Sequence, residues 1–327
     1  MSSNIRRVAV ISFAVACLSV MAFGWGDGGH MAVNRAAAQH IPASMPTFFR
    51  AATDRLVYLG PEPDRWRHRE EFSVKNAQEP DHFIDLERTE GIGELPEGRY
   101  NFIRKMYEKR AAEIAAGNPH ADDFLPERVG FQPYITLEVY DRLKIAFRDY
   151  RRLQAEGKPT EPVEQNIVFY AGWLGHYVAD GANPMHTTVN YNGWVGPNPN
   201  GYTTARDTHW NFESSFVNAN LSRLDFTKDV KEPQVLADPF RDYIKYLWAS
   251  NAQVEPAYKL EKIGAFKGSG TPEGVAFLNS RLAAGTQMLV DMWYTAWVES
   301  EKPVQDPFAP AVKMPVTATP AAKAAAK

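Results

Sequence analysis

The segment between residues 163 and 180 restricts the possible folds most, because it is apolar on nearly every side of a helix. Such a helix has to be covered by other elements, and the remaining segments with regular apolar spacing also follow a helical pattern. Convincing alternating strands are absent from the sequence. We therefore predict an all-α fold with a single multi-helix domain. Helices are expected over residues 32–40, 100–116, 135–155, 163–180, 207–219, 239–249 and 273–300.

The first 24 residues are expected to be a secretory signal peptide. Two arginines precede an apolar run that ends in small residues, which is the order typical of a signal cleaved before Trp25. Lipoprotein processing at Cys17 is an alternative, because the residues before this cysteine loosely resemble a lipobox. Cleavage before Trp25 predicts a protein that is secreted or periplasmic, with no stable membrane insertion after signal cleavage.

Composition limits the remaining possibilities. The net charge of −3 excludes a basic protein that coats nucleic acid, and the single cysteine excludes both an intramolecular disulfide and a cysteine-ligated zinc site. A metal site would therefore need histidines and carboxylates. Residues 302–327 are rich in Pro, Ala and Lys and are expected to form a disordered tail, so the domain should span residues 25–301. No protein partner is implied.

Two histidines precede carboxylates at the spacing of one helical turn. His176 and Asp180 share one face of the expected central helix, and His209 and Glu213 form a second such pair. One pair alone is more often a surface contact than a metal site. Two pairs, with His186 between them, predict a metal site, and zinc accepts such nitrogen and oxygen ligands when thiolates are absent.

The start of the expected mature chain adds further ligand atoms. Cleavage before Trp25 would expose an α-amino group with a pKa near ~8, which a metal ion can readily deprotonate. This nitrogen and the Trp25 carbonyl oxygen can chelate one ion, and the following glycines allow His30 to reach the same ion. His40 is the alternative if His30 points elsewhere.

The order and spacing of five motifs resemble one superfamily of zinc-dependent phosphodiesterases. This superfamily holds the single-strand nucleases of the S-one and P-one type and the bacterial zinc-dependent phospholipases C. The resemblance extends from Trp25 to about Phe216. The motifs are W-G-x-x-G-H at Trp25–His30, P-D-x-x-R at Pro63–Arg67, H-F-I-D at His82–Asp85, G-H-Y-V-A-D-G-x-x-P-M-H at Gly175–His186 and H-x-x-x-E at His209–Glu213.

The resemblance implies a helical domain around a trinuclear zinc cluster, with Asp180 bridging two of the ions. Asp81 is a rival to Asp64 as a ligand, because it lies directly beside His82. The implied ligand sets are Asp64, His82, His176 and Asp180 for one zinc; the Trp25 amine and carbonyl, His30 and Asp180 for the second; and His186, His209 and Glu213 for the third.

Zinc ions held in this way would provide a hydroxide at neutral pH and the positive charge that an acidic protein needs to bind a phosphodiester. Asp64 would also orient the attacking water, and Arg67 would clamp a phosphate oxygen with its planar guanidinium. Each residue also has a simpler interpretation. Asp64 and Arg67 would then form a surface ion pair, His82 would be structural, and Glu213 would be solvated.

The motifs leave two substrate classes open. The spacing of the first motif favours a nuclease, in which Phe83 would stack on a base and Asp85 would bond to its edge. Glu213 in the third zinc site, and the segment 190–201 in place of a nuclease motif, resemble the phospholipases instead. The first expectation is therefore a nuclease for single-stranded DNA or RNA, and the second is a phospholipase C acting on phospholipid head groups.

A third possibility is a secreted binding protein whose zinc ions are purely structural. Structural zinc sites usually have four protein ligands, whereas catalytic sites keep one position open. The expected third site has only three protein ligands, so the sequence favours a catalytic role.

Overall fold

The helices and loops of residues 25–302 are described by a computed structural model, and residues 1–24 and 303–327 lie outside the described range. The signal peptide, Cys17 and nearly all of the expected tail therefore lie outside it. Between residues 25 and 302 there is no strand, only one isolated bridge between Tyr191 and Gly193, so the all-α prediction is confirmed. None of the helices in this range has the length and apolar character needed to cross a membrane.

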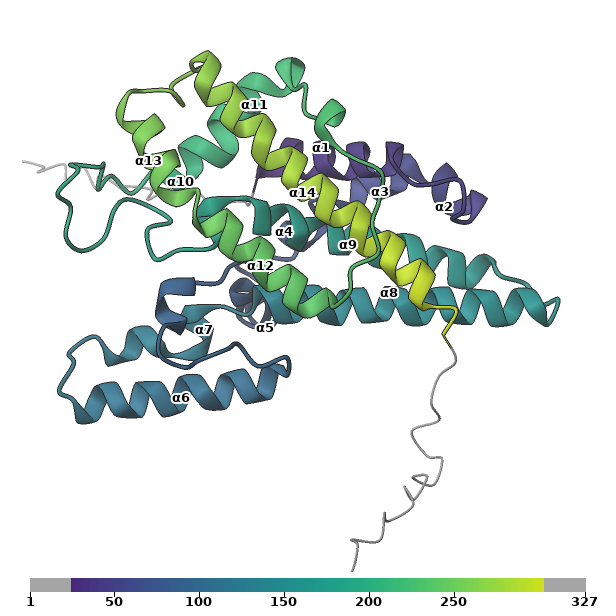
Figure 1. The fold of residues 1–327 in the computed structure, drawn as a ribbon, viewed down its shortest axis with the longest axis horizontal. Helices are drawn as coiled ribbons and strands as arrows, with labels where there is room; N and C mark the ends of the chain where they lie inside the picture. Colours follow the sequence, from purple (N-terminus) through teal and green to yellow (C-terminus); the bar gives the residue numbers. More distant parts are fainter. Residues whose placement is uncertain (1–24, 303–327) are drawn as a thin grey trace, which may run out of the picture.

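Helix α9 (Glu161–Ala182) runs through the middle of the molecule, as its apolar sequence predicts (Figure 1). Every residue from Leu174 to Ala182 is buried. Helix α8 (Gln132–Ala155) returns alongside α9 as a long hairpin, and α14 (Pro272–Glu299) packs on α9 from another side. Within this core the Trp293 indole of α14 donates a hydrogen bond to the Ala171 carbonyl oxygen of α9 at 3.1 Å.

Two glycines of α9 bring the N-terminal helices into direct contact with its backbone. A Cβ at Gly172 would lie 2.4 Å from the Leu59 side chain of α3 (Thr53–Leu59), and a Cβ at Gly175 would lie 2.0 Å from the Asn34 side chain of α1 (Gly26–Gln39). The close approach of α1 stacks the His30 ring on the His176 ring, with centroids 4.0 Å apart. This packing therefore sets the separation of two predicted metal ligands.

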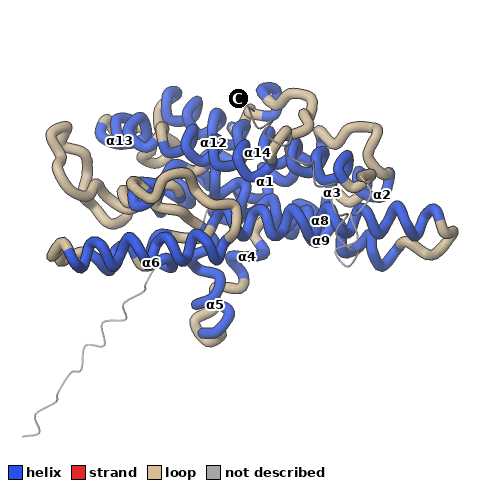
Figure 2. The backbone as a smooth tube through the Cα atoms, turned by 60° about the horizontal axis from the view of Figure 1, so that its bottom comes forward, coloured by secondary structure: helices blue, strands red, loops and turns tan. Residues whose placement is uncertain are grey.

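Shorter helices surround this core, and Figure 2 shows α5 projecting from one side of it. Helices α6 and α7 form a separate lobe at the end of the molecule opposite the tip of the α8–α9 hairpin (Figure 1). The shorter helices are α2 (Thr47–Ala51), α4 (Glu62–Arg65), α5 (Phe72–Gln78), α6 (Arg99–Ala115), α7 (Pro126–Val129), α10 (Thr208–Trp210), α11 (Val217–Asn220), α12 (Pro239–Asn251) and α13 (Val254–Lys262).

Three of the sequence predictions about helices were incomplete or wrong. The first helix begins at Gly26 instead of residue 32. The sequence pattern missed α2 to α5, α7 and α13. The segment 207–219 is not one α-helix, because α10 leads into a π-helix at Asn211–Phe216, which is followed by α11. The wider π turn contains Glu213 and therefore sets its approach to the site.

Candidate metal centre

The side chains predicted to bind metal lie together and are buried. They come from α1, α4 and α9, from the short turns Glu79–His82 and Pro184–His186, from α10 and from the π-helix. Within each group the ligand atoms lie within 4.8 Å of one another, so each group can hold a metal ion. The first group is Asp64, His82 and His176; the second is His30, His176 and Asp180; and the third is His186, His209 and Glu213.

The two imidazoles of the first group form a nearly equilateral triangle with the Asp180 carboxylate of the second group. His82 Nδ1 lies 3.0 Å from His176 Nε2, and Asp180 Oδ2 lies 3.2 Å and 3.3 Å from these two nitrogens. Ligands held about 2.0–2.2 Å from a tetrahedral ion lie about 3.3–3.6 Å from one another, which is close to these distances. Asp64 Oδ1 is farther away, 3.8 Å from His82 Nδ1, and can act as a fourth ligand after a small movement.

The other oxygen of Asp180 faces His30. His30 Nε2 lies 3.4 Å from Asp180 Oδ1 and 3.9 Å from Asp64 Oδ2. Both ring nitrogens of His30 and both of these oxygens are buried and have no hydrogen-bond partner. Asp180 thus directs one oxygen to each of two neighbouring groups, which is the geometry of a bridging carboxylate.

The third group stands at the end of α9. His186 Nε2 lies 3.1 Å from His209 Nε2 and 3.1 Å from Glu213 Oε2, and His209 Nε2 lies 2.6 Å from the same oxygen. Asn183 donates a hydrogen bond to Glu213 Oε2 at 3.3 Å. Glu213 is fully buried and its Oε1 has no partner, so the prediction of a solvated Glu213 is wrong.

Surrounding hydrogen bonds determine which imidazole nitrogens face inward. His176 Nδ1 donates to the Gly60 carbonyl at 2.9 Å, and His186 Nδ1 donates to the His82 carbonyl at 2.7 Å. His82 in turn uses Nε2 to donate to Gln78 Oε1 at 2.8 Å. The inward nitrogens of these rings point toward other ligand atoms, so a metal cation can bind between them in place of a proton. The residues therefore fit metal ions.

Sequence reasoning missed these supporting groups. Gln78 precedes His82 by four residues, so the same spacing that identified the ligand pairs could have identified it. The Gly60 carbonyl and Asn183 carry no comparable signal, because only the tertiary fold brings them to the ligands.

The protonation states also suit metal binding. Burial disfavours the charge on Asp180, but the facing His186 and His176 outweigh burial and hold the pKa of Asp180 well below its usual value. Burial lowers the pKa of His82 to about 3 and also lowers the pKa of His30. Burial raises the pKa of Asp64 to about 6. His30 and His82 are therefore neutral near neutral pH. At His176 and His186 burial is outweighed by the facing carboxylates, which raise the pKa of His176 and raise that of His186 to about 9, so a metal ion would displace a proton from these two rings.

The two alternative ligands proposed from the sequence, Asp81 in place of Asp64 and His40 in place of His30, lie outside the three groups. Asp81 forms an ion pair with Arg99 at 3.3 Å instead of joining His82, and burial raises its pKa to about 7. His40 Nδ1 bonds to the Ala36 carbonyl at 2.7 Å. The structure therefore brings Asp64, and not Asp81, beside the predicted ligands.

Trp25 is hydrogen-bonded through its side chain to the residue that precedes Asp180. Its indole is fully buried and donates to the Ala179 carbonyl at 2.5 Å, directly before Asp180. Its carbonyl accepts the Gly29 N–H at 3.2 Å and so opens the first turn of α1. Coordination by the Trp25 amine stays a prediction, because that amine exists only after cleavage.

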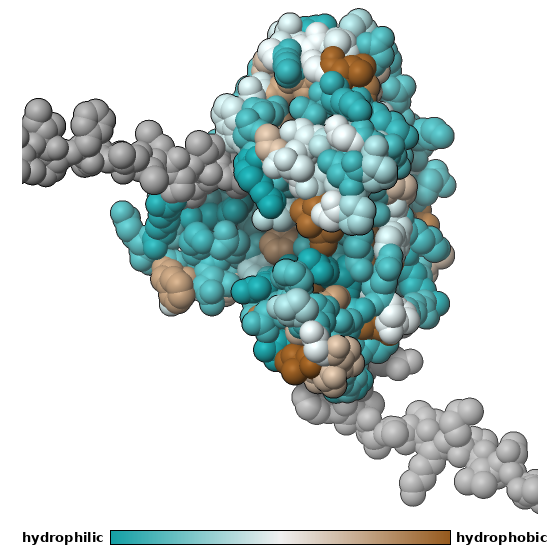
Figure 3. All heavy atoms as spheres, turned by 90° about the vertical axis from the view of Figure 1, so that its left-hand side faces the viewer, coloured by the Kyte–Doolittle hydropathy of each residue, from teal (hydrophilic) through white to brown (hydrophobic). Residues whose placement is uncertain are grey.

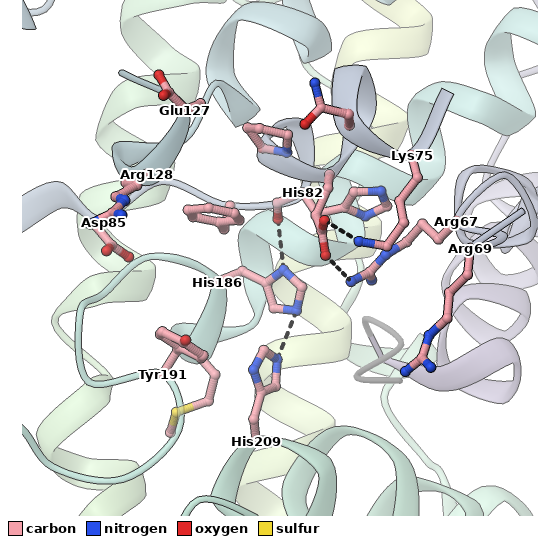
Figure 4. A pocket seen from close by; sticks show the side chains of 15 residues that line it. Arg67, Arg69, Lys75, His82, Asp85, Glu127, Arg128, His186, Tyr191 and His209 are labelled. Atoms are coloured by element: carbon pink, nitrogen blue, oxygen red, sulfur yellow. Dashed lines mark hydrogen bonds and ion pairs between the residues drawn. The ribbon is translucent and has the colours of Figure 1, made fainter. Parts of the chain in front are cut away.

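A cavity of about 940 Å³ opens beside the first and third groups, and we call it the Phe83 cavity (Figure 4). Arg67 lies at its edge, 3.3 Å from Asp64 Oδ1, and because Asp64 is only 3% exposed this contact is not a surface ion pair. Basic side chains outnumber acidic ones in the lining. The lining residues used below are Arg67, Arg69, Lys75, Phe83, Asp85, Arg128 and Tyr191.

The backbone holds Phe83 and Asp85 at this cavity, where the sequence motif placed them. Asp85 N–H donates to the Val129 carbonyl at 2.7 Å, and a Cβ at Gly130 would lie 2.1 Å from the Phe83 carbonyl oxygen. Gly130 also has a φ of +98°, so only glycine suits this crossing of two segments. Burial raises the pKa of Asp85 to about 8, which leaves its carboxyl group protonated at neutral pH.

The site thus joins three candidate metal positions to a cavity with basic and aromatic walls. Such an arrangement can bind an anion, hold a planar ring and place water beside metal ions. In sequence comparisons the chain matches neither a protein-family model nor a curated protein, so its function is inferred from this geometry and from the motifs.

Proposed function

We propose that this protein is a zinc-dependent phosphodiesterase that hydrolyses single-stranded DNA or RNA. The observation that carries the proposal is the convergence of three buried His/carboxylate groups on one cavity whose walls are basic and aromatic. Order and spacing of the five motifs, which resemble the zinc-dependent nucleases and phospholipases C, support the same reaction. Nitrogen and carboxylate donors without thiolates favour zinc among the common metal ions.

The zinc ions would be held by the three groups, with Asp180 shared between two of them and the Trp25 amine completing the second. When bound, zinc supplies Lewis acidity toward a phosphate and activates water for attack. Asp64 has one buried oxygen, Oδ2, with no hydrogen-bond partner. This oxygen can orient that water by accepting a hydrogen bond from it. The other oxygen of Asp64 accepts from Arg67 and fixes its position.

Arg67 would bind a non-bridging oxygen of the phosphate through its planar guanidinium. Arg69 and Lys75 line the same cavity and would hold adjacent phosphates of a strand (Figure 4). Lys75 would exchange its ion pair with Glu79, at 2.6 Å, for such a phosphate. The positive charge is thus local, and a chain with a net charge of −3 can still bind a polyanion.

Phe83 would stack on a base, and the protonated Asp85 would donate a hydrogen bond to an acceptor on its edge. Stacking tolerates every base because each one has a π face, and it contributes roughly 1–3 kcal/mol per base. This pair therefore supports a nucleic acid as the substrate. The side of the molecule that carries α13 is mainly hydrophilic, with hydrophobic residues scattered over it (Figure 3).

Nucleotide affinity should depend on pH through Asp85. Below about pH 8 the carboxyl group is protonated and donates its hydrogen bond, and above this pH the bond is lost and a negative charge faces the ligand. We expect the affinity for a phosphorothioate adenine dinucleotide to fall about three- to tenfold as the pH rises through 8. Calorimetric titration of the wild type at several pH values measures this fall.

Asp85→Asn keeps a hydrogen-bond donor that does not titrate, so this variant should bind the dinucleotide with little change over the same pH range. An equal pH dependence in the variant and the wild type would remove Asp85 from the base site.

A phospholipase C is the second candidate, and one observation favours it. Helix α5 projects from the molecule and exposes Phe72 and Val74, which are 71% and 47% accessible, while Lys75 of the same helix lines the Phe83 cavity. Exposed apolar side chains beside a cavity can enter a lipid surface. Glu213 in the third group agrees with the phospholipases as well.

Initial rates on two substrates distinguish the candidates. Purified protein with a verified Trp25 N-terminus is assayed on single-stranded DNA or RNA and on phosphatidylcholine vesicles, each with and without a zinc chelator. We expect cleavage of nucleic acid that the chelator abolishes, little lipid turnover, and a roughly 5- to 100-fold loss of nucleic acid cleavage in Phe83→Ala.

Phe72→Ala is the matched control, because it removes an aromatic ring from α5 without touching the base site. Lipid turnover that depends on Phe72 would instead identify a phospholipase C. Metal-loaded protein that cleaves neither substrate would indicate a binding protein.

A further inference from the structure

Asp64 and Arg67 also line a second cavity, and we call it the Trp210 cavity. It has a volume of about 620 Å³, and Arg67 lines both this cavity and the Phe83 cavity. Candidate metal ligands line both cavities: Asp64 lines this one, and His82, His186 and His209 line the Phe83 cavity. The Trp210 cavity is lined by Gly26, Asp27, Asp64, Arg65, Arg67, His68, Trp210, Ser214 and Asn218.

Trp210 is unusual among the large aromatic residues near the site. It follows the candidate ligand His209 directly, yet its side chain is 40% exposed, whereas Phe212, two residues later, is buried in the core. Among the described residues its ring packs against no other aromatic ring. The cavity thus contains one large aromatic surface that the fold itself does not use.

The polar groups around this ring suit a nucleotide. Ser214 Oγ is buried and has no hydrogen-bond partner, and it lines the cavity beneath the start of α1. Arg65, which also pairs with Glu62 at 2.6 Å, and His68 bring basic groups to the lining, which contains the acidic Asp27 and Asp64 as well. Asn218 offers both a donor and an acceptor. A cavity of this volume lies within the range of small-molecule sites, and a nucleotide would bring to it a ring for Trp210 and polar atoms for Ser214.

We propose that a single strand crosses the metal centre and occupies both cavities, with one base on Phe83 and the base across the scissile phosphate on Trp210. This inference rests on the proposed nuclease function and specifies its substrate as a chain of at least two nucleotides. The phosphate beside Arg67 is then the one between the two stacked bases, because Arg67 lines both cavities.

The test measures how much affinity a second nucleotide adds. Nuclease-resistant phosphorothioate oligonucleotides and a 5′-mononucleotide, each with a fluorescent label, are titrated with the zinc-loaded protein, and binding is followed by anisotropy. In the wild type, lengthening the ligand from one to two nucleotides should raise the affinity about 5- to 150-fold. Trp210→Ala should lose most of this gain and bind the mononucleotide as the wild type does, and Trp210→Phe should keep most of the gain.

Trp248→Ala is the matched control, because Trp248 is 41% exposed and lines neither cavity. It should bind every ligand as the wild type does. A wild type that gains nothing from the second nucleotide, or a Trp210→Ala variant that gains as much as the wild type, overturns the Trp210 subsite. Equal weakening of mononucleotide and dinucleotide by Trp210→Ala also overturns it, because the tryptophan would then support the fold of the site. If the wild type binds none of the ligands, the proposed nuclease function itself fails.

Discussion

Asp180→Asn is expected to reduce phosphodiester hydrolysis by a factor of about a thousand or more. Asp180 directs one oxygen to His30 and the other to His82 and His176, so its amide would remove a charged ligand from two ions at once. Metal analysis of the purified variant should show fewer ions than the three that we propose for the wild type. His176→Ala should have a similar effect, because His176 belongs to two of the groups.

Asp291→Asn provides the control for replacing a buried carboxylate with an amide. Asp291 is only 8% exposed and accepts hydrogen bonds from Gln234 and Gln287, far along α14 and outside the three groups. This variant should keep both its metal content and its rate. Near-normal hydrolysis in Asp180→Asn, with three ions still bound, would contradict the bridging role.

A peptide extension on the nitrogen of Trp25 is expected to remove one bound ion and lower the rate about tenfold or more. The extension converts an α-amine of pKa near ~8 into an amide nitrogen that cannot bind a metal ion. The indole bond to Ala179 holds Trp25 beside Asp180 in either form, so the two proteins should differ in this ligand and not in packing. Metal content and initial rates of the extended and the cleaved protein are compared directly.

The same peptide attached at the C-terminus serves as the control and should change neither quantity. If the N-terminally extended protein binds all its metal and retains its full rate, the Trp25 amine is not a ligand.

Much of the fold could be predicted from the sequence because long helices carry several repeats of their apolar pattern. The segment 163–180 identified α9, and the segments 135–155 and 273–300 identified α8 and α14 to within a few residues. Helices of four to seven residues, such as α4 and α5, contain too few turns to show a period and depend on tertiary packing for their stability.

The candidate ligands also fall into those that local spacing predicts and those that only tertiary packing brings together. Local spacing alone indicated the pairs His176–Asp180 and His209–Glu213, because each pair lies on one helical segment. Placing His30 beside them depended on the motif resemblance, since only the packing of α1 on α9 brings it there.

The walls of the two cavities were less accessible to sequence reasoning. Nothing in the sequence distinguishes Arg69, Lys75 and Arg128 from other basic residues of the chain. Trp210 differs from a core tryptophan in its exposure, which only the structure shows. These residues line the cavities because loops and short helices from distant parts of the chain meet there. Their spacing along the sequence gives no sign of this.

The three groups of candidate ligands also have a consequence for the unfolded chain. Residues 25–327 contain no cysteine, so no disulfide can cross-link them. An ion shared by His82 and Asp180 would join positions 98 residues apart in the chain. A covalent link that closed a loop of this length would stabilise a protein by on the order of 4 kcal/mol through the lost entropy of the open chain. The metal ions would therefore serve this protein as its cross-links, and its folding would be tied to the supply of metal.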